Sequence, residues 1–176
     1  ARWVPELRTL STCHDDAGYI AALAAGIRRQ WQQQAPAERL LLSFHGVPQR
    51  SLLLGDPYHC QCLKTARLLR EALGLPPERV LVTFQSRFGK AKWLEPYTEP
   101  TLRQLAAQGV ASVDVACPGF TADCLETLEE IAQEGRHAFL QAGGRQFRYL
   151  PCLNDDMAWI SALADMAERH LQGWDT

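Results

Sequence analysis

The chain contains 176 residues, of which 47% are apolar and 22% are charged, and its formal net charge at pH 7 is -2. This composition is typical of a globular protein with one hydrophobic core, so we predict a single domain over residues 1–176. Nucleic acid is excluded as an expected partner, because proteins that bind it usually carry a basic excess. No apolar run approaches the roughly 20 residues of a membrane-spanning helix.

The cysteine pattern indicates a reducing compartment. No two cysteines have the Cys-x-x-Cys spacing of common zinc and redox motifs, and no disulfide framework is evident. We interpret most of them as small apolar core residues, and without a signal pattern at the amino terminus we expect a cytoplasmic protein. The six are Cys13, Cys60, Cys62, Cys117, Cys124 and Cys152.

Two helix-strand units are predicted first along the chain. A helix over Ala17–Trp31 has apolar residues at helical spacing, and Asp15-Asp16 can cap it. The apolar run Arg39–Phe44 predicts a buried strand. A second helix lies within 56–74, with an Asp cap, a Pro at its first position and a terminal Gly. The β-branched run Arg79–Phe84 then predicts a second strand.

After a long connection, the alternation continues to the end of the chain. We predict helices over Thr98–Gln108, Asp123–Leu140 and Asp155–Leu171, and strands over Ser112–Cys117 and Gln146–Leu150. Alternating strands and helices predict an α/β fold with a four-stranded, parallel, doubly wound sheet covered by helices on both faces. Ligands of such sheets bind beyond the carboxyl ends of the strands, so the functional residues are expected there.

A histidine stands directly after the first predicted strand, in Ser43-Phe44-His45-Gly46-Val47-Pro48. Near neutral pH an imidazole at that place can accept protons or bind a transition metal. A purely structural role for His45 is the alternative.

Three glutamates recur every fourth residue after the third predicted strand. On one helix, Glu126, Glu130 and Glu134 would form a row of carboxylates on one face. The alternative interpretation is that such a row has no function and simply forms a charged face exposed to solvent. We favour a functional one, because Glu126 falls at the rim of the crevice that His45 would face, and imidazole with carboxylate can hold a divalent cation and accept protons.

The connection between residues 85 and 97 is predicted to be a binding loop, since long loops in compact domains tend to be functional. Its aromatic residues can stack on a flat apolar ligand, and its arginine can meet ligand carboxylates. In the alternative, Phe88 and Trp93 simply pin the loop to the core. The candidate substrate-binding residues are Ser86, Arg87, Phe88, Trp93 and Tyr97.

Six stretches of the chain resemble ferrochelatases, the enzymes that insert ferrous iron into a porphyrin. They occur in the family's order and spacing: SFHGVP, GDPY, FQSRFG, WLEPYT, CPGFTADCLETLEEI, and GG followed by YLPCLND. The resemblance runs from about Leu40 to Trp174. It implies two similar Rossmann-like, chelatase-type halves with the porphyrin in the cleft between them, of which this chain matches the carboxy-terminal half.

The resemblance also implies the reaction and the residue roles. Fe²⁺, the substrate metal, would enter protoporphyrin IX to give protoheme in the last step of heme biosynthesis, with release of two pyrrole protons. His45 and Glu126 match the catalytic pair that removes protons or ligates iron, while Glu130 and Glu134 match a metal route. Trp93 matches a residue that contacts the porphyrin.

Departures from the family pattern carry further expectations. Some members have a histidine where this chain has Cys124, so an accessory role of that position is not carried over. No 2Fe-2S cluster is expected, because the cysteines that ligate one in some members lie in a carboxy-terminal extension that this sequence does not show. Without the amino-terminal half, which supplies much of the porphyrin pocket, we expect the chain alone to be inactive.

Two alternatives stay open at this point: a stand-alone module that binds tetrapyrrole or metal, and a small cobalt or nickel chelatase that acts as a homodimer. The sequence does not distinguish protoporphyrin from coproporphyrin, assign the base between His45 and Glu126, or reveal the oligomeric state. The insolubility of porphyrins makes peripheral membrane contact a further expectation.

Overall fold

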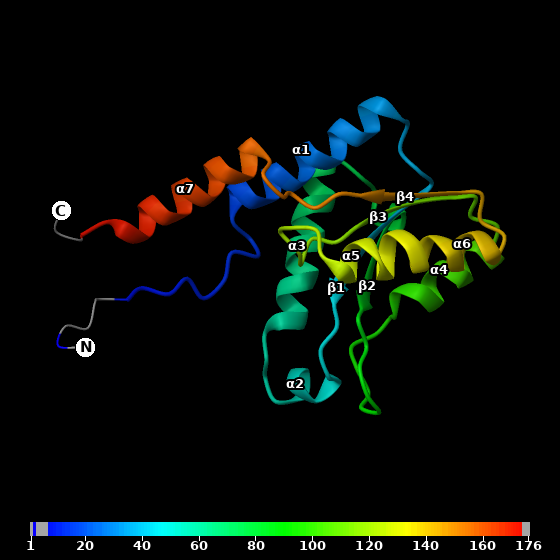
Figure 1. Ribbon diagram of the computed structural model, residues 1–176, viewed down its shortest axis with the longest axis horizontal. Coiled ribbons are helices and arrows are strands. Elements are labelled where there is room, and N and C mark those ends of the chain that lie inside the picture. The colour runs from blue at the N-terminus through cyan, green and yellow to red at the C-terminus, as the bar shows by residue number, and fades with distance from the viewer. Residues whose placement is uncertain (1, 3–6, 174–176) are drawn as a thin grey trace.

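A computed structural model describes residues 2 and 7–173 of the chain (Figure 1). The ends of the predicted domain 1–176, and Trp174 at the end of the family resemblance, lie outside the described residues. Within the described part, no helix combines the length and the apolar character needed to cross a membrane.

Four parallel strands form one sheet in the order β2-β1-β3-β4. They are β1 (Arg39–His45), β2 (Val80–Gln85), β3 (Ser112–Ala116) and β4 (Gln146–Leu150). The predicted four-stranded parallel fold is confirmed. Two strands extend one residue beyond their predicted ends, and the extra residue is His45 in β1 and Gln85 in β2.

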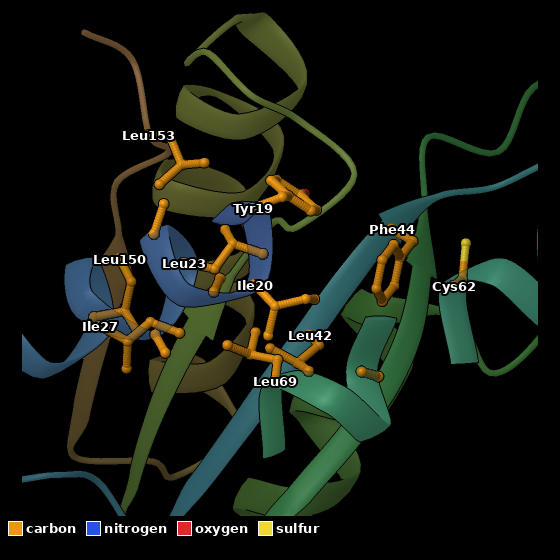
Figure 2. Close-up of a cluster of buried hydrophobic side chains, with 14 of the residues drawn as sticks. Tyr19, Ile20, Leu23, Ile27, Leu42, Phe44, Cys62, Leu69, Leu150 and Leu153 are labelled. Carbon is orange, nitrogen blue, oxygen red and sulfur yellow. The ribbon is translucent and has the colours of Figure 1, made fainter. Parts of the chain in front are cut away.

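One face of the sheet is covered by α1 (Ala17–Gln33), α3 (Tyr58–Leu73) and α7 (Met157–Leu171), with α1 packed between the other two. Figure 2 shows the apolar cluster under these helices, in which side chains of α1 lie against Leu42 and Phe44 of β1. Burial of each large apolar side chain in such a cluster stabilises the fold by about 1.5–3 kcal/mol.

The opposite face is covered by α4 (Thr98–Ala107) and α6 (Arg136–Gln141), which pack on each other and on a second apolar cluster. β1 contributes to both clusters, since Leu40 and Leu42 belong to the first and Leu41 to the second. Helices on both faces confirm the doubly wound arrangement, and they explain why β1 reads as a continuous apolar run rather than an alternating one.

The capping residues confirm the predicted start of α1 and shift the start of the last helix. Asp16 alone caps α1, accepting hydrogen bonds from the backbone N–H groups of Gly18 and Tyr19. The last helix was predicted from Asp155, but Asp156 caps it and it begins at Met157. These carboxylates satisfy backbone donors that have no partner within the helix.

Two short helices were not predicted. The helix α2 (Gln49–Leu53) contains no buried residue, so its sequence has no apolar periodicity to detect. A single 3₁₀ turn, η1 (Pro77–Arg79), precedes β2.

The predicted continuous helix over 123–140 is wrong in its geometry. The chain forms α5 (Leu125–Leu128), then the π-helical segment η2 (Glu130–Gly135), then α6. In η2 the N–H of Glu134 donates to the carbonyl oxygen of Glu129, five residues earlier, at 2.9 Å. Such π-helical turns are rare and often stand at functional sites.

As interpreted from the sequence, most of the cysteines belong to the core: Cys62 and Cys117 are members of the apolar clusters, and Cys13 and Cys152 pack against them. All six are free thiols, and burial is complete for Cys62 and Cys117 only, while Cys60 is exposed and the other three are half-buried. Burial raises the pKa of the Cys62 thiol to about 11.

A buried ion pair joins β3 and β4 at the end of the sheet away from the strand carboxyl ends. Asp114, which is 1% exposed, accepts hydrogen bonds from Nε and one terminal nitrogen of Arg148 at 2.7 and 2.8 Å. The indole N–H of Trp31 and the backbone N–H of Ala37 also donate to it, at 2.8 and 3.2 Å. The carboxylate therefore has four donors, which ties α1 and the start of β1 to the sheet.

Loss of the arginine should destabilise the fold strongly, because it leaves the Asp114 charge buried without a cation. We expect Arg148→Met to lower the free energy of unfolding by about 3–5 kcal/mol, measured by urea unfolding. The matched control is Arg103→Met, which breaks the exposed Glu99–Arg103 pair and should cost only about 0.3–0.5 kcal/mol. Equal losses in the two variants would contradict this account.

Candidate functional site

The carboxyl ends of β1 and β2 bring the first site residues together. In the parallel register, His45 and Gln85 are Cα partners, and each is the last residue of its strand. The N–H of Gly46 continues the ladder by donating to the carbonyl oxygen of Gln85 at 2.8 Å. The site therefore lies at the edge of the sheet where the sequence places it.

The ring of His45 is half-buried and held in a defined orientation. Its Nδ1 lies 2.6 Å from the carbonyl oxygen of Gly46. Because a carbonyl oxygen only accepts, Nδ1 carries the proton, and in the neutral ring Nε2 keeps its lone pair. The ring packs between Trp93 and Phe120, with centroid distances of 6.5 and 6.1 Å. The hydroxyl of Tyr58 donates to the His45 carbonyl oxygen at 2.8 Å, which fixes the backbone as well.

Glycine is required immediately after this histidine. A Cβ atom at position 46 would lie 2.8 Å from the carbonyl oxygen of Gln85 and 3.1 Å from Cε3 of Trp93. The absence of a side chain lets Trp93 pack beside His45 and lets the ladder continue past the end of β1.

Glu126 lies in the first turn of α5, and its backbone is tied to the end of β2. The side-chain amide of Gln85 donates from Nε2 to the Glu126 carbonyl oxygen at 2.6 Å. A hydrogen bond with the Cys124 side chain, together with a backbone hydrogen bond, holds the pKa of the Glu126 carboxyl below its usual value. The carboxyl is therefore ionised near neutral pH.

The predicted row of glutamates lines one open hollow of about 500 Å³, together with Ser86 and Arg87. Glu126, Glu130 and Glu134 all contribute, and so does Glu129, which was not predicted. We call this the acidic hollow.

Glu130 differs from the other glutamates because its carboxylate binds the loop. The backbone N–H and the hydroxyl of Ser86 donate to its two oxygens at 2.6 and 2.5 Å. Ser86 adopts a positive φ of 61°, which aims both donors at the same carboxylate. Glu130 thus anchors the start of the loop to η2, a role that sequence spacing did not indicate.

The four predicted metal ligands His45, Glu126, Glu130 and Glu134 do not form a closed cage. In the part of the chain that the structure describes, no three His, Cys, Asp or Glu side chains are grouped so that they could hold a metal ion. Instead, the three glutamates lie along the wall of the acidic hollow.

The candidate substrate-binding residues of the predicted loop lie in different surroundings. The guanidinium carbon of Arg87 lies 4.8 Å from the ring centroid of Tyr97, and with Ser86 both line a second hollow of about 200 Å³. The alternative that aromatics pin the loop fits Trp93, which packs on His45. The interpretation that aromatic residues pin the loop to the core is wrong for Phe88, whose side chain is 83% exposed.

Sequence reasoning missed three residues that shape the site: Gln85, Phe120 and Asp123. Gln85 ends β2 and Phe120 follows β3, but glutamine and phenylalanine at such places do not by themselves indicate a function. Asp123 was assigned to a helix start, yet Cys124 is the N-cap of α5.

Asp123 binds the turn before α5 to the connection after β4. Its carboxylate accepts hydrogen bonds from the Tyr149 hydroxyl at 2.5 Å, the Asn154 amide at 2.8 Å and the Cys152 N–H at 3.2 Å. Burial raises the pKa of the Asp123 carboxyl, but these bonds outweigh it and hold the pKa below the ordinary value. The cluster fixes the turn from which Glu126 emerges.

Comparison with known proteins identifies the relatives of the chain. The model of the family described as Ferrochelatase matches residues 1–171. The chain is 70% identical over 175 residues to the ferrochelatase of Methylibium petroleiphilum, which covers 99% of the chain and 48% of that relative.

Two further relatives give the same picture. The ferrochelatase of a Polaromonas species is 63% identical, over 99% of the chain and 48% of its own length. That of Dechloromonas aromatica is 60% identical, over 98% of the chain and 48% of its own length. The chain thus spans about half the length of the curated relatives it matches.

The Asp123 cluster predicts a pH-dependent stability. Its folded-state pKa lies below the unfolded value of about 3.9, so its ionised form stabilises the fold above about pH 4, and this contribution is lost as the pH falls through the folded-state pKa. We expect Asp123→Asn to lower the free energy of unfolding by about 2 kcal/mol at pH 7, the scale of hydrogen bonds to a charged group, with a smaller gap near pH 3. Urea unfolding between pH 7 and 3 measures it.

The control is Asp165→Asn on the exposed face of α7, which should leave the stability unchanged at every pH. A gap for Asp123→Asn that stays constant from pH 7 to 3 would show that ionisation of this carboxyl does not stabilise the fold.

Proposed function

The chain belongs to the ferrochelatase family, and from that premise we propose that it is the carboxy-terminal half of an enzyme that inserts Fe²⁺ into protoporphyrin IX. The products are protoheme and the two protons released from the pyrrole nitrogens. One arrangement carries the proposal: His45 ends β1, and Glu126 lies in the first turn of α5, whose backbone is hydrogen-bonded to Gln85, the register partner of His45.

Insertion of iron into a porphyrin needs a base and a metal ligand, which His45 and Glu126 can supply. Two pyrrole protons must leave while the cation loses its water, so a base and a metal ligand must converge near the centre of the macrocycle. We assign proton removal to Nε2 of His45, since Nδ1 is committed to Gly46. We assign the cation to Glu126, since it is ionised and continuous with the acidic hollow. Imidazole and carboxylate bind ferrous iron without the tight hold of thiolates.

The acidic hollow suits a path for the incoming cation. Its carboxylates lie along a wall rather than around one point, so each can bind a divalent ion transiently and pass it on. On this proposal Fe²⁺ moves from Glu134 past Glu130 to Glu126.

The loop suits contact with the porphyrin. Trp93 packs beside His45, where an aromatic ring can face the macrocycle, and the exposed ring of Phe88 is free to do the same. Arg87 can pair with the propionates, and its position over the Tyr97 ring keeps the guanidinium near the crevice. Ser86 holds the loop in place through Glu130.

We propose that the amino-terminal half of the enzyme docks on α7. The apolar side chains of Ile160, Leu163 and Leu171 are 41–49% exposed on this helix. Arg8 donates hydrogen bonds to the carbonyl oxygens of His170 and Gln172, at the end of α7. The amino-terminal segment therefore runs beside α7, away from the sheet (Figure 1), so the residues that precede it in the relatives enter there.

The two alternatives receive less support. A stand-alone binding module or a small homodimeric chelatase would be complete at this length, whereas the relatives at 60–70% identity are about twice as long. We propose the cytoplasm as the compartment, since six free thiols and a ferrous substrate both suit reducing conditions.

Replacement of either catalytic candidate should abolish most turnover without unfolding the protein. In the full-length enzyme, we expect His45→Ala and Glu126→Gln each to lower kcat about 100-fold or more, the scale of general acid-base and positioning effects. Anaerobic absorbance of protoporphyrin with Fe²⁺ measures it. Glu71→Gln, an exposed change on α3, is the control and should retain full turnover. Normal turnover by His45→Ala would remove the imidazole from the mechanism.

The described chain alone should show no metallation, and adding the separately expressed amino-terminal half should restore it. Ile160→Asp with Leu163→Asp should prevent this recovery, because each places a charge in the proposed apolar contact. Ser161→Asp adds a charge to the same helix outside the apolar stripe and should leave recovery intact. Full turnover by the chain alone, or recovery with the double variant, would contradict the proposal. Copurification of the halves measures docking directly.

A further inference from the structure

The side chain of Gln85 is the centre of a buried polar network between the two segments of the site. Gln85 is 4% exposed, and its amide oxygen accepts hydrogen bonds from the Ser43 hydroxyl at 2.7 Å and the Cys117 thiol at 3.5 Å. The network continues from Ser43 to Thr98 at 2.8 Å, and from Thr98 to Thr83 at 2.9 Å. No charged side chain bonds to the amide among the described residues.

The orientation of the amide is set by its partners. The carbonyl oxygen of Glu126 can only accept, so the nitrogen of the amide must face it, and the oxygen must face Ser43 and Cys117. A flipped amide would place two carbonyl oxygens 2.6 Å apart in a buried position, a strongly unfavourable arrangement. The side chain therefore has one satisfied orientation.

Gln85 also joins the two proposed catalytic groups through separate bonds. Its backbone is the register partner of His45 and accepts the N–H of Gly46 at 2.8 Å. Its side chain donates to Glu126 at 2.6 Å, in the short helix just before the widened turn of η2. One buried residue thus sets the distance between the end of β1 and the start of α5.

We propose that Gln85 is a positioning residue for metallation, which holds Glu126 at the distance from His45 that the reaction needs. The inference rests on the function proposed above. Gln85 has no proton to exchange with the porphyrin and contacts neither metal nor macrocycle in this role. Its effect is geometric, and displacement of a reacting group by about 1 Å can cost up to about 100-fold in rate.

The test uses two replacements of similar length in the full-length enzyme, Gln85→Glu and Gln85→Met. An ionised glutamate cannot donate to the Glu126 carbonyl oxygen, whereas a protonated one can donate to it and still accept from Ser43. Burial favours the protonated form of a carboxyl at this position, so lowering the pH is expected to convert the ionised form into the protonated one. Methionine makes neither bond at any pH.

We expect Gln85→Glu to lower kcat about 10- to 100-fold at pH 8, with little change in KM, and to recover toward the unsubstituted enzyme as the pH falls toward 6. Activity at each pH is expressed relative to the unsubstituted enzyme, so that the pH dependence of the reaction itself cancels. Gln85→Met should be impaired equally at all pH values. A merely structural residue would not give a recovery that depends on a donor proton.

The control is Thr83→Val, which removes a fully buried hydroxyl from the far end of the same network without touching the bond to Glu126. It should lower the unfolding midpoint but leave kcat unchanged. Equal losses of kcat in Thr83→Val and Gln85→Glu would overturn the positioning role, as would full activity of Gln85→Met. If the unsubstituted enzyme makes no metalloporphyrin, the proposed function fails and this inference falls with it.

Discussion

The parallel pairing of β1 with β2 is the constraint from which the site follows. Once these strands are in register, His45 and Gln85 stand side by side at the same edge of the sheet, and the backbone of Gly46 continues the ladder past them. The loop that carries Trp93 then returns against that glycine. A slip of one residue would turn every side chain of β1 to the opposite face, burying the imidazole or removing it from the crevice. The hydrogen bond from the Ser43 hydroxyl to Gln85 and the packing of β1 in both apolar clusters hold this register.

The fold was accessible from sequence because its signals are local and redundant. The apolar run of β1, the helical spacing in α1 and the alternation of elements all point to one arrangement, and the strand ends locate the crevice. His45 and Glu126 were singled out because imidazole and carboxylate groups are typical of acid-base and metal chemistry. The widened geometry of η2 was not accessible, since apolar residues at helical spacing fit an α-helix and a π-helical turn equally well.

Other misses concern side chains whose role depends on a distant partner. Gln85 and Ser86 lie 41 and 44 residues from the glutamates that they bind. An amide or a hydroxyl at the end of a strand does not by itself indicate a function in the sequence. The spacing and the family resemblance assigned Glu130 to the metal row, but neither indicated that its carboxylate also anchors the loop. Stability and chemistry are also separated in space: the Asp114–Arg148 pair holds the opposite end of the sheet, where it can be optimised for packing alone.

The π-helical segment η2 also affects how α5, which carries Glu126, is rotated about the helix axis relative to α6, which packs on the core. A π-helical turn is equivalent to an α-helix that has gained one residue, so removing a residue between Glu130 and Gly135 would restore ordinary winding. Ordinary winding advances by about 100° per residue, and α6 is anchored by the buried ring of Phe139. The rotation would therefore strain α5 against the hydrogen bonds of Gln85 and Asp123 that hold it, and the side chain of Glu126 would be displaced. The number of residues in this one stretch thus contributes, together with those bonds, to the direction in which the helix presents its acid.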